Sequence, residues 1–190
     1  MQVRRLGIPD VVEVIPSKHG DHRGYFSEVF KRAAFEAEGI NIDWVQDNQS
    51  FSASPGTVRG LHYQIPPAAQ DKLVRVLRGA IYDVAVDIRV GSPSYGRWVA
   101  CELSADKWNQ LVVPAGFAHG FMTLTPDVEV IYKVSAPYSR DHERAIFWQD
   151  PELGIDWPDL GVPPSLSDKD RCAPPLSALA SPFAATGAST

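Results

Sequence analysis

The stretch Ala80-Ile-Tyr-Asp-Val-Ala-Val-Asp-Ile-Arg89 decides the fold class of this chain. Tyr82, Val84, Val86 and Ile88 occupy every second position in it, so an extended strand here has one wholly apolar face that belongs in the core. From residue 43 onward, short runs rich in Val, Ile, Tyr, Phe and Trp recur at intervals of roughly ten residues, separated by Pro and Gly turns. This rhythm is typical of an antiparallel sandwich or barrel.

Other strands are predicted at residues 11–15, 97–103, 109–113, 119–125 and 128–136. No helical periodicity separates these strands, as a fold of alternating strands and helices would require. A turn that ends at Arg23-Gly24 is expected after the first strand. Residues 31–38 are strong helix formers followed by Gly39, which predicts one short helix. The sequence therefore predicts an all-β fold with little helix.

The composition predicts one domain. The chain has 190 residues, of which 44% are hydrophobic and 22% charged, and its composition does not change abruptly along its length. The domain is predicted to span residues 1–176. After Trp148 the Pro-, Asp- and Leu-rich segments are expected to form ordered coil packed on the domain. Residues 177–190 are mostly small or polar and are predicted to be a flexible tail.

Charge and cysteine usage exclude several classes of partner. A net charge of −5 gives no electrostatic footprint for nucleic acid or for an anionic membrane. No apolar run approaches the roughly 18 residues of a membrane helix, and no signal peptide is visible. The two cysteines lack a CxxC spacing and a disulfide framework. These features predict a cytoplasmic protein that binds neither nucleic acid nor membrane.

Residues 57–72 concentrate polar side chains that are unfavourable to bury unless something charged binds there. His62 suits proton removal near neutral pH, although it could also be an ordinary hydrogen-bonded histidine. Arg59 and Lys72 would each need an anionic partner if they pointed inward. Strict alternation would turn Arg59 outward when His62 points inward, so a β-bulge is predicted at Gly60.

The segment Pro114-Ala-Gly-Phe-Ala-His119-Gly resembles the second motif of the cupins, small jelly-roll barrels that often bind metal. The corresponding first motif reads His62-Tyr63-Gln64, and no Glu follows it before Gly79. Two of the four expected ligands are therefore missing, whereas zinc, iron and manganese sites need three or four. No metal is expected, and a metal-dependent cupin that uses both histidines remains an alternative.

Two tyrosines are further candidates. Tyr132 shares strand parity with Val130 and Val134, which places its hydroxyl on the buried face. A buried tyrosine often only satisfies a hydrogen bond, but a phenol opposite a base could also move protons stereospecifically. Tyr138 follows Pro137 and is expected to be a surface or pocket-lip ring that is available for stacking.

Seven ordered motifs together resemble those of the dTDP-4-dehydrorhamnose 3,5-epimerases. They are Asp21-His-Arg-Gly-Tyr-Phe-Ser-Glu28, Gln46-Asp-Asn48-Gln-Ser, Val58-Arg-Gly-Leu-His-Tyr-Gln64, Ala69-Gln-Asp-Lys-Leu-Val-Arg75, Asp83-Val-Ala-Val-Asp-Ile-Arg89, Pro114-Ala-Gly-Phe-Ala-His-Gly-Phe121 and Leu166-Ser-Asp-Lys-Asp170. The resemblance runs from about residue 3 to about residue 176. It implies a homodimeric, cupin-type double-stranded β-helix (jelly roll) barrel with short peripheral helices, without metal or cofactor.

The implied reaction inverts C3 and C5 of dTDP-4-dehydro-6-deoxy-D-glucose and gives dTDP-4-dehydro-L-rhamnose, in dTDP-L-rhamnose biosynthesis. A C4 ketone acidifies both protons, so the enzyme needs a base, an enolate stabiliser and an acid on the far face. The resemblance implies that His62 is the base, oriented by Asp170. It implies further that Lys72 lies near the C4 oxygen and that Tyr132 returns the proton.

The resemblance also implies a set of substrate-binding residues: Arg23, Glu28, Gln46, Asn48, Arg59, Lys72, His119, Tyr138, Glu143 and Lys169. Arg59, His119 and Lys169 suit sugar or diphosphate oxygens, since cation-to-phosphate hydrogen bonds are strong. Tyr138 resembles the ring that stacks on thymine. Arg23 and Glu28 match residues that reach the site of the partner subunit.

The departures from the family pattern are small. Gln49 and Phe51 stand where His and Lys or similar polar residues are expected, and Tyr25 stands where Phe is common. The related 3,4-ketoisomerases lack the phenol acid, so Tyr132 argues against that branch. Epimerisation at C3 alone stays open, because it depends on how the sugar lies in the same pocket. A non-catalytic module that binds nucleotide sugars is a third alternative.

Overall fold

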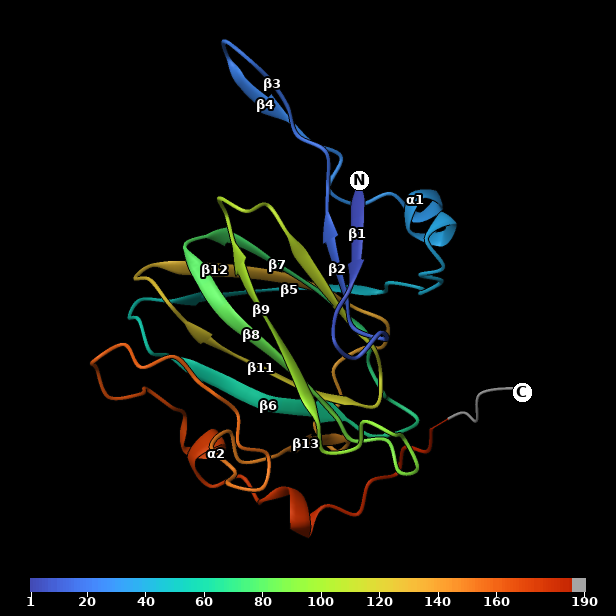
Figure 1. Ribbon diagram of the computed structural model, residues 1–190, viewed down its shortest axis with the longest axis vertical. Helices are drawn as coiled ribbons and strands as arrows, with labels where there is room; N and C mark the ends of the chain where they lie inside the picture. The colour runs from blue at the N-terminus through green and yellow to red at the C-terminus, as the bar shows by residue number, and fades with distance from the viewer. Residues whose placement is uncertain (186–190) are drawn as a thin grey trace.

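The computed structural model describes residues 1–185 and shows a barrel of two facing antiparallel sheets (Figure 1). The first sheet has six strands, in the order β1 (Gln2–Arg5), β2 (Val12–Ile15), β10 (Gln110–Val113), β7 (Lys72–Arg78), β12 (Val128–Val134) and β5 (Gln46–Ser52). The second has five, in the order β13 (Glu143–Ala145), β6 (Val58–Gln64), β11 (Phe117–Thr123), β8 (Ala80–Asp87) and β9 (Trp98–Ser104).

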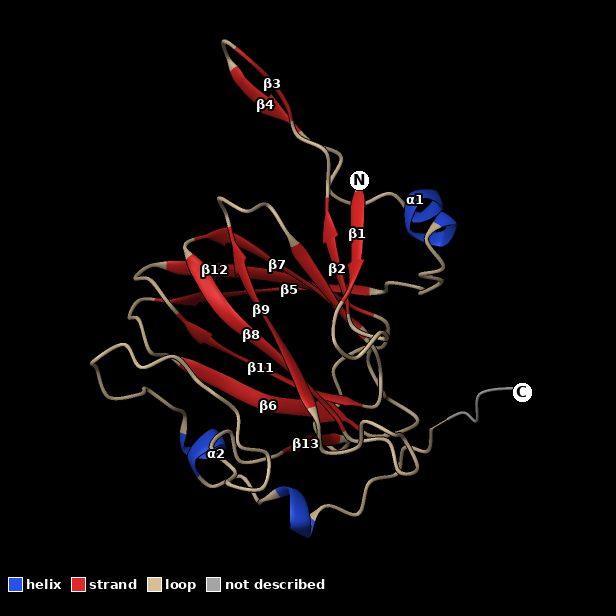
Figure 2. Cartoon of the chain, in the orientation of Figure 1, coloured by secondary structure: helices blue, strands red, loops and turns tan. Residues whose placement is uncertain are grey.

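Helices are short and lie outside the sheets (Figure 2). They are α1 (Arg32–Ala37), α2 (Asp168–Arg171) and the 3-10 turn η1 (Leu176–Ala178). The helix predicted at residues 31–38 is thus confirmed, and the predicted strands match β2, β9, β10, β11 and β12 to within two residues at each end. Within residues 1–185, no helix is long and apolar enough to cross a membrane.

Strand β8 is buried on both faces. Ile81 and Ala85 point between the sheets and contribute to the main apolar core. The wholly apolar face, represented by Val84 and Val86, instead packs on the outside of its sheet, under the C-terminal part of the chain. Residues Ile146, Leu153, Trp157, Leu176, Leu179 and Phe183 form much of that cover. The expectation that this face is buried is correct, although its cover is the C-terminal coil and not the second sheet.

The C-terminal coil continues past the predicted domain end at residue 176. Ala184 forms a parallel bridge with Val90, and the backbone N–H of Val90 donates to the carbonyl of Phe183 at 2.9 Å. The packed chain therefore extends beyond the boundary predicted for a flexible tail. The last part of that predicted tail, residues 186–190, lies outside the described residues.

The predicted bulge in β6 is present. His119 of β11 faces His62, whereas Phe121, two residues further along β11, faces Arg59, three residues back in β6. The additional residue lets Arg59 and His62 lie on the same side of the strand. Gly60 has a φ of +132°, and a Cβ there would lie 2.5 Å from the Cα of Gly120. The bulge therefore requires glycine at this position.

A hairpin of β3 (His19–Asp21) and β4 (Gly24–Phe26) projects away from the barrel, at the top of Figure 1. Phe26 is 71% exposed. At its base, the ammonium of Lys18 lies 4.0 Å from the ring centroid of Trp108. The sequence predicted only a turn here, because the strands have three residues each and no buried face to produce an alternating pattern. We call this hairpin the arm.

The Gly60→Ala substitution is expected to lower the free energy of unfolding by roughly 3 kcal/mol or more, since it adds a steric clash to backbone strain. Gly24→Ala is the matched control: Gly24 has a φ of +134°, but a Cβ there meets no atom within 4 Å. The control should lose only the strain contribution, about 1–2 kcal/mol. Denaturant unfolding measures both, and equal losses would contradict the close contact between β6 and β11.

Candidate active site

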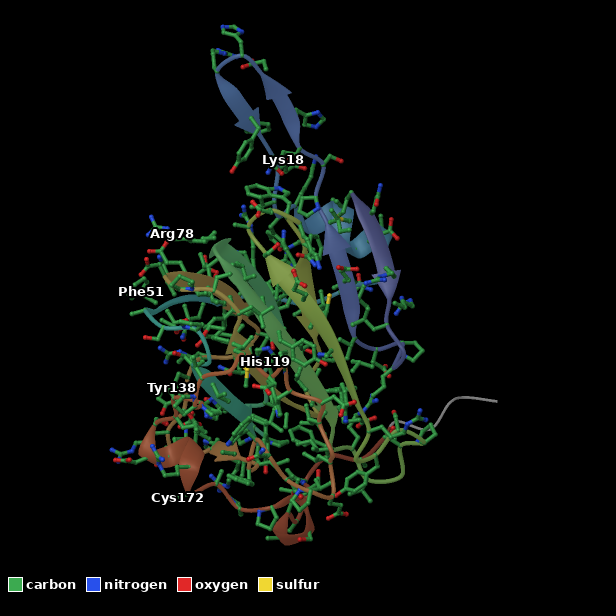
Figure 3. The ribbon with its side chains drawn as sticks, turned by 60° about the vertical axis from the view of Figure 1, so that its left-hand side comes forward. Lys18, Phe51, Arg78, His119, Tyr138 and Cys172 are labelled. Carbon is green, nitrogen blue, oxygen red and sulfur yellow. The ribbon has the colours of Figure 1, made fainter. Side chains whose placement is uncertain are left out.

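A cavity of about 500 Å³ opens between the two sheets. Its walls include Ser50, Thr57, Val58, Arg59, His62, Lys72, Val74, His119, Phe121, Val130, Tyr132, Ser165, Leu166, Ser167 and Asp170. Figure 3 shows His119 in the interior, between the sheets. The cavity therefore gathers all four predicted catalytic residues, together with Arg59 and His119 from the predicted binding set.

His62 is hydrogen-bonded to Asp170, a residue 108 positions away in the chain. The Nε2 atom of His62 lies 2.5 Å from Oδ1 of Asp170, which is buried. Burial alone would raise the pKa of Asp170, but hydrogen bonds from His62 and Ser167 together hold it below its ordinary value. An ionised carboxylate accepts a hydrogen bond from Nε2–H and leaves Nδ1 of the neutral imidazole with a free lone pair. The pair thus has the geometry of an oriented base.

Asp170 is fixed by the N-cap residue at the start of α2. Ser167 is the N-cap residue, and its hydroxyl accepts from the backbone N–H of Asp170 at 3.2 Å. The same hydroxyl donates to Oδ2 of Asp170 at 2.8 Å. Each carboxylate oxygen therefore has a partner, one on the helix cap and one on His62. The pattern Ser167-x-x-Asp170 is the signal that could have revealed this short helix and the role of Ser167.

Lys72 enters the cavity floor from β7. Its Nζ donates to the backbone carbonyl of His62 at 3.2 Å. Burial lowers the pKa of Lys72 to about 8, and the fall is limited by the carboxylates of Asp83 and Glu143. Below that pH the ammonium is charged, and it has no direct carboxylate contact within the described chain. A buried cation of this kind is suited to a developing oxyanion.

His119 forms a second pair, with Asp83. Its Nε2 lies 2.8 Å from Oδ1 of Asp83, which is completely buried. Burial lowers the pKa of His119, although the nearby Asp83 opposes the change. The imidazole is therefore neutral near pH 7, and with Nε2–H on Asp83 its Nδ1 is an acceptor. Of the sugar and diphosphate oxygens that the sequence had suggested for His119, such a group suits a sugar hydroxyl better.

Tyr132 faces the cavity from the opposite sheet to His62. It lies on β12, where it pairs with Val74 of β7 and Asn48 of β5. Burial raises the pKa of the Tyr132 hydroxyl, and the positive charge of Arg59 limits the rise. The phenol therefore stays protonated near neutral pH and is available as a proton donor.

Five of the predicted binding residues form one hydrogen-bonded network at the rim, outside the cavity lining. The Gln46 amide donates to Asn48 at 2.7 Å and accepts from the backbone N–H of Tyr138 at 3.3 Å. The hydroxyl of Tyr138 donates to Glu143 at 3.0 Å, and the other oxygen of Glu143 lies 2.5 Å from Nζ of Lys169. We call these residues the rim network. It places Tyr138 at the edge of the molecule (Figure 3).

Arg59 lines the cavity and is exposed. Its guanidinium donates to the hydroxyl of Ser52 at 3.2 Å and to the carbonyl of Phe51 at 3.0 Å. These neutral acceptors orient the side chain without neutralising its charge, so it can still bind an anion.

Arg23 and Glu28 do not join this site. Arg23 is on the arm and forms an exposed ion pair with Asp21 at 2.6 Å. Glu28 follows the arm and lies 3.8 Å from Nζ of Lys31. The arm projects away from the barrel of its own chain (Figure 1), and neither residue lines the cavity.

Several residues of the candidate site were missed by the sequence reasoning. Ser50 and Thr57 line the cavity, and Asp83 orients His119. Asp83 had a visible signal, because an aspartate between apolar residues of a strand has to be paired when it is buried. Ser50 and Thr57 had none, since small hydroxyl residues are common on strands and turns.

Gln64 occupies the place where a second metal-binding histidine would stand in the cupin motif. Its side chain is buried and bonded to the backbone of the segment that carries Tyr138. In the described part of the chain, no group of three or more His, Cys, Asp or Glu side chains is placed to hold a metal ion.

Barrel and cavity together define a class, the cupin-type isomerases, which hold a small substrate between two sheets and move its protons. The family model described as dTDP-4-dehydrorhamnose 3,5-epimerase matches residues 5–178. The chain belongs to this dTDP-4-dehydrorhamnose 3,5-epimerase family. The predicted cupin-type fold, isomerase class and epimerase function are thereby confirmed.

Relatives support the assignment over nearly the whole chain. The dTDP-4-dehydrorhamnose 3,5-epimerase of Sinorhizobium fredii is 54% identical over 179 residues, which is 94% of this chain and 91% of that protein. The Bacillus anthracis enzyme, crystallised with TDP and PPi, is 48% identical, with a TM-score of 0.88 over 92% of this chain and 98% of that one. A 3,5-epimerase of Legionella pneumophila in complex with dTDP-4-keto-L-rhamnose is 42% identical, with a TM-score of 0.89 over 94% of each chain.

The pKa of Lys72 leads to a prediction about pH. Because the ammonium loses its proton near pH 8, kcat/KM should fall as the pH rises through about 8, where the free enzyme loses the cation. Tyr132 does not account for this limb, since burial raises its pKa above the ordinary value of 10.0. A pH profile of kcat/KM that stays flat between about pH 7 and 9.5 would contradict the need for a charged Lys72. Lys72→Arg should move the limb to higher pH, because arginine stays protonated.

Proposed function

We propose that this cavity inverts C3 and C5 of dTDP-4-dehydro-6-deoxy-D-glucose, with His62 as the base and Tyr132 as the acid. The observation that carries the proposal is that these two side chains line one cavity from opposite sheets. A sugar ring between them would present one face to the imidazole and the other to the phenol. Inversion needs this arrangement, because the proton leaves from one face and returns to the other.

Each inversion is a balanced pair of proton transfers. The free Nδ1 of His62 removes the proton from the carbon next to the C4 ketone, and the electron pair moves to the C4 oxygen as an enolate. The ammonium of Lys72 stabilises this oxyanion, and Asp170 stabilises the imidazolium. Tyr132 then donates its proton to the opposite face of the same carbon. His62 returns its proton to solvent and Tyr132 regains one, so the pair can act again at the second carbon.

The nucleotide is proposed to lie towards the rim. Arg59 and Lys169 supply cations for the diphosphate, and the exposed ring of Tyr138 offers a stacking surface for thymine. Gln46, Asn48 and Glu143 offer acceptors and donors beside that ring. The ligands named for the Bacillus anthracis and Legionella pneumophila relatives, TDP and dTDP-4-keto-L-rhamnose, support a dTDP sugar as the substrate.

A homodimer is part of the proposal. The arm carries Arg23 and exposes Tyr25 and Phe26, which are 56% and 71% exposed. Exposed aromatic side chains on a projecting hairpin are typical of a docking surface. A second copy of the chain would cover them, and Arg23 and Glu28 would then reach the cavity of that copy.

The reaction is tested by incubating the enzyme with its substrate in deuterated water. Deuterium is expected at both C3 and C5, since every proton that returns to carbon comes from a group in exchange with solvent. The His62→Ala variant should lose exchange at both carbons by a factor of about 10² or more while still binding dTDP. Label at C3 alone would assign the chain to C3-only epimerisation, and normal exchange in the variant would reject His62 as the base. Activity that a chelator removes would point to the metal-dependent alternative.

Tyr132→Phe separates proton removal from inversion. With the base intact, C3 should still exchange its proton for deuterium, but the proton returns from the side of His62. Labelled starting sugar should therefore accumulate, with formation of the inverted product reduced by about 10² or more. NMR of the sugar protons distinguishes the two outcomes. A variant that inverts at the normal rate would show that another group is the acid.

A further inference from the structure

The side chain of Tyr138 is exposed, yet hydrogen bonds hold it in place. Its side chain is 56% exposed, so it gains little from burial. Yet its backbone N–H donates to Gln46 at 3.3 Å and its hydroxyl donates to Glu143 at 3.0 Å. The chain on both sides of it is bonded to Gln64, from Pro137 to Ser139. Holding an exposed aromatic ring costs conformational entropy, and a ring that is already held loses less of that entropy when a ligand binds to it.

Gln64 is hydrogen-bonded to the residues on both sides of Tyr138. Its Nε2 donates to the carbonyls of Ala68 at 2.6 Å and of Pro137 at 3.2 Å. Its Oε1 accepts from the backbone N–H of Ser139 at 2.7 Å. All three bonds fix the orientation of the amide, because the flipped amide would set its NH₂ against the N–H of Ser139 and its oxygen against two carbonyls.

Only an amide can make this set of bonds. Two donors and one acceptor are needed, whereas a histidine at this position has two ring nitrogens in total. Gln64 is 3% exposed, and without its amide the three backbone groups would lose the one side chain that links them. Both N–H donors of the Gln64 amide are used in these bonds. The side chain that stands where cupins have a metal ligand therefore supports the segment that carries Tyr138.

We infer that Gln64 is a positioning residue for recognition of the nucleobase: it holds residues 137–139 so that the ring of Tyr138 is already in place before the nucleotide binds. The inference rests on the proposed function, in which Tyr138 stacks on thymine. Gln64 lies opposite Glu143 in the pairing of β6 with β13. The two side chains therefore hold Tyr138 from neighbouring strands, Gln64 through the backbone of Pro137 and Ser139 on either side of it and Glu143 through its hydroxyl.

The test compares binding of dTDP and of inorganic pyrophosphate by calorimetry. Gln64→Met and Tyr138→Ala should each raise the Kd for dTDP about tenfold, in line with loss of a stacked base. Pyrophosphate has no base, so its Kd should stay within about twofold in both variants. The rate of deuterium exchange at saturating substrate should also be retained in Gln64→Met, since the cavity residues are untouched. Loss of rate with unchanged dTDP affinity would overturn the inference.

Gln70→Met is the matched control, because the Gln70 side chain donates to Ala136 in the same segment at 2.7 Å but does not flank Tyr138. It should change the Kd for dTDP by less than about threefold. The double variant of Gln64 and Tyr138 should bind dTDP no more weakly than Tyr138→Ala alone, since Gln64 acts through that ring.

The outcomes separate the inference from the proposal on which it rests. If Tyr138→Ala leaves dTDP binding unchanged, the stacking role of Tyr138 is wrong and the inference falls with it. If Tyr138→Ala weakens binding but Gln64→Met does not, or if the two losses add, Tyr138 keeps its role and Gln64 does not position it. Equal losses in Gln64→Met and Gln70→Met would show a general loosening of the segment and would also overturn the inference.

Discussion

The site depends on the close approach of two backbones, at Gly60 in β6 and Gly120 in β11. A Cβ on Gly60 would lie 2.5 Å from the Cα of Gly120, and one on Gly120 would lie 2.8 Å from the carbonyl oxygen of Arg59. This contact allows β6 to carry one additional residue against β11. A regular strand would turn either Arg59 or His62 away from the cavity. With the bulge, a cation and a base enter the same space from one strand.

Charged and polar groups inside the barrel are tolerated because most of them are paired. Asp170 holds His62, and Asp83 holds His119. Among the described residues, one oxygen of Asp83 is buried without a hydrogen-bond partner, and Lys72 lies near it as a partly compensating charge. Lys72 itself donates to the backbone carbonyl of His62, and burial lowers its pKa. The cavity thus keeps a buried cation that a substrate oxyanion can stabilise, which is how a binding site differs from a fully compensated core.

Much of the fold followed from local patterns, and the failures have specific physical reasons. The alternation in β8 predicts a strand correctly, but it could not show that the apolar face lies under the C-terminal coil, because both faces of this strand are buried. The arm had no detectable signal, since it buries neither face. Helix α2 has four residues, too few for helical periodicity, and only its Ser-x-x-Asp cap marks it.

By itself, the sequence determined the strand type, the bulge at Gly60 and, through ordered motifs, the family and the candidate residues. These features depend on neighbours in the chain, where a period of two or a glycine between two polar residues has direct conformational consequences. The resemblance implied that Asp170 orients His62, but only the tertiary structure gave the contact between them across 108 residues. It also decided that Tyr132 faces them from the other sheet and that Gln64 binds the segment of Tyr138. Such contacts depend on strand order and on the path of the C-terminal coil, which local alternation does not encode.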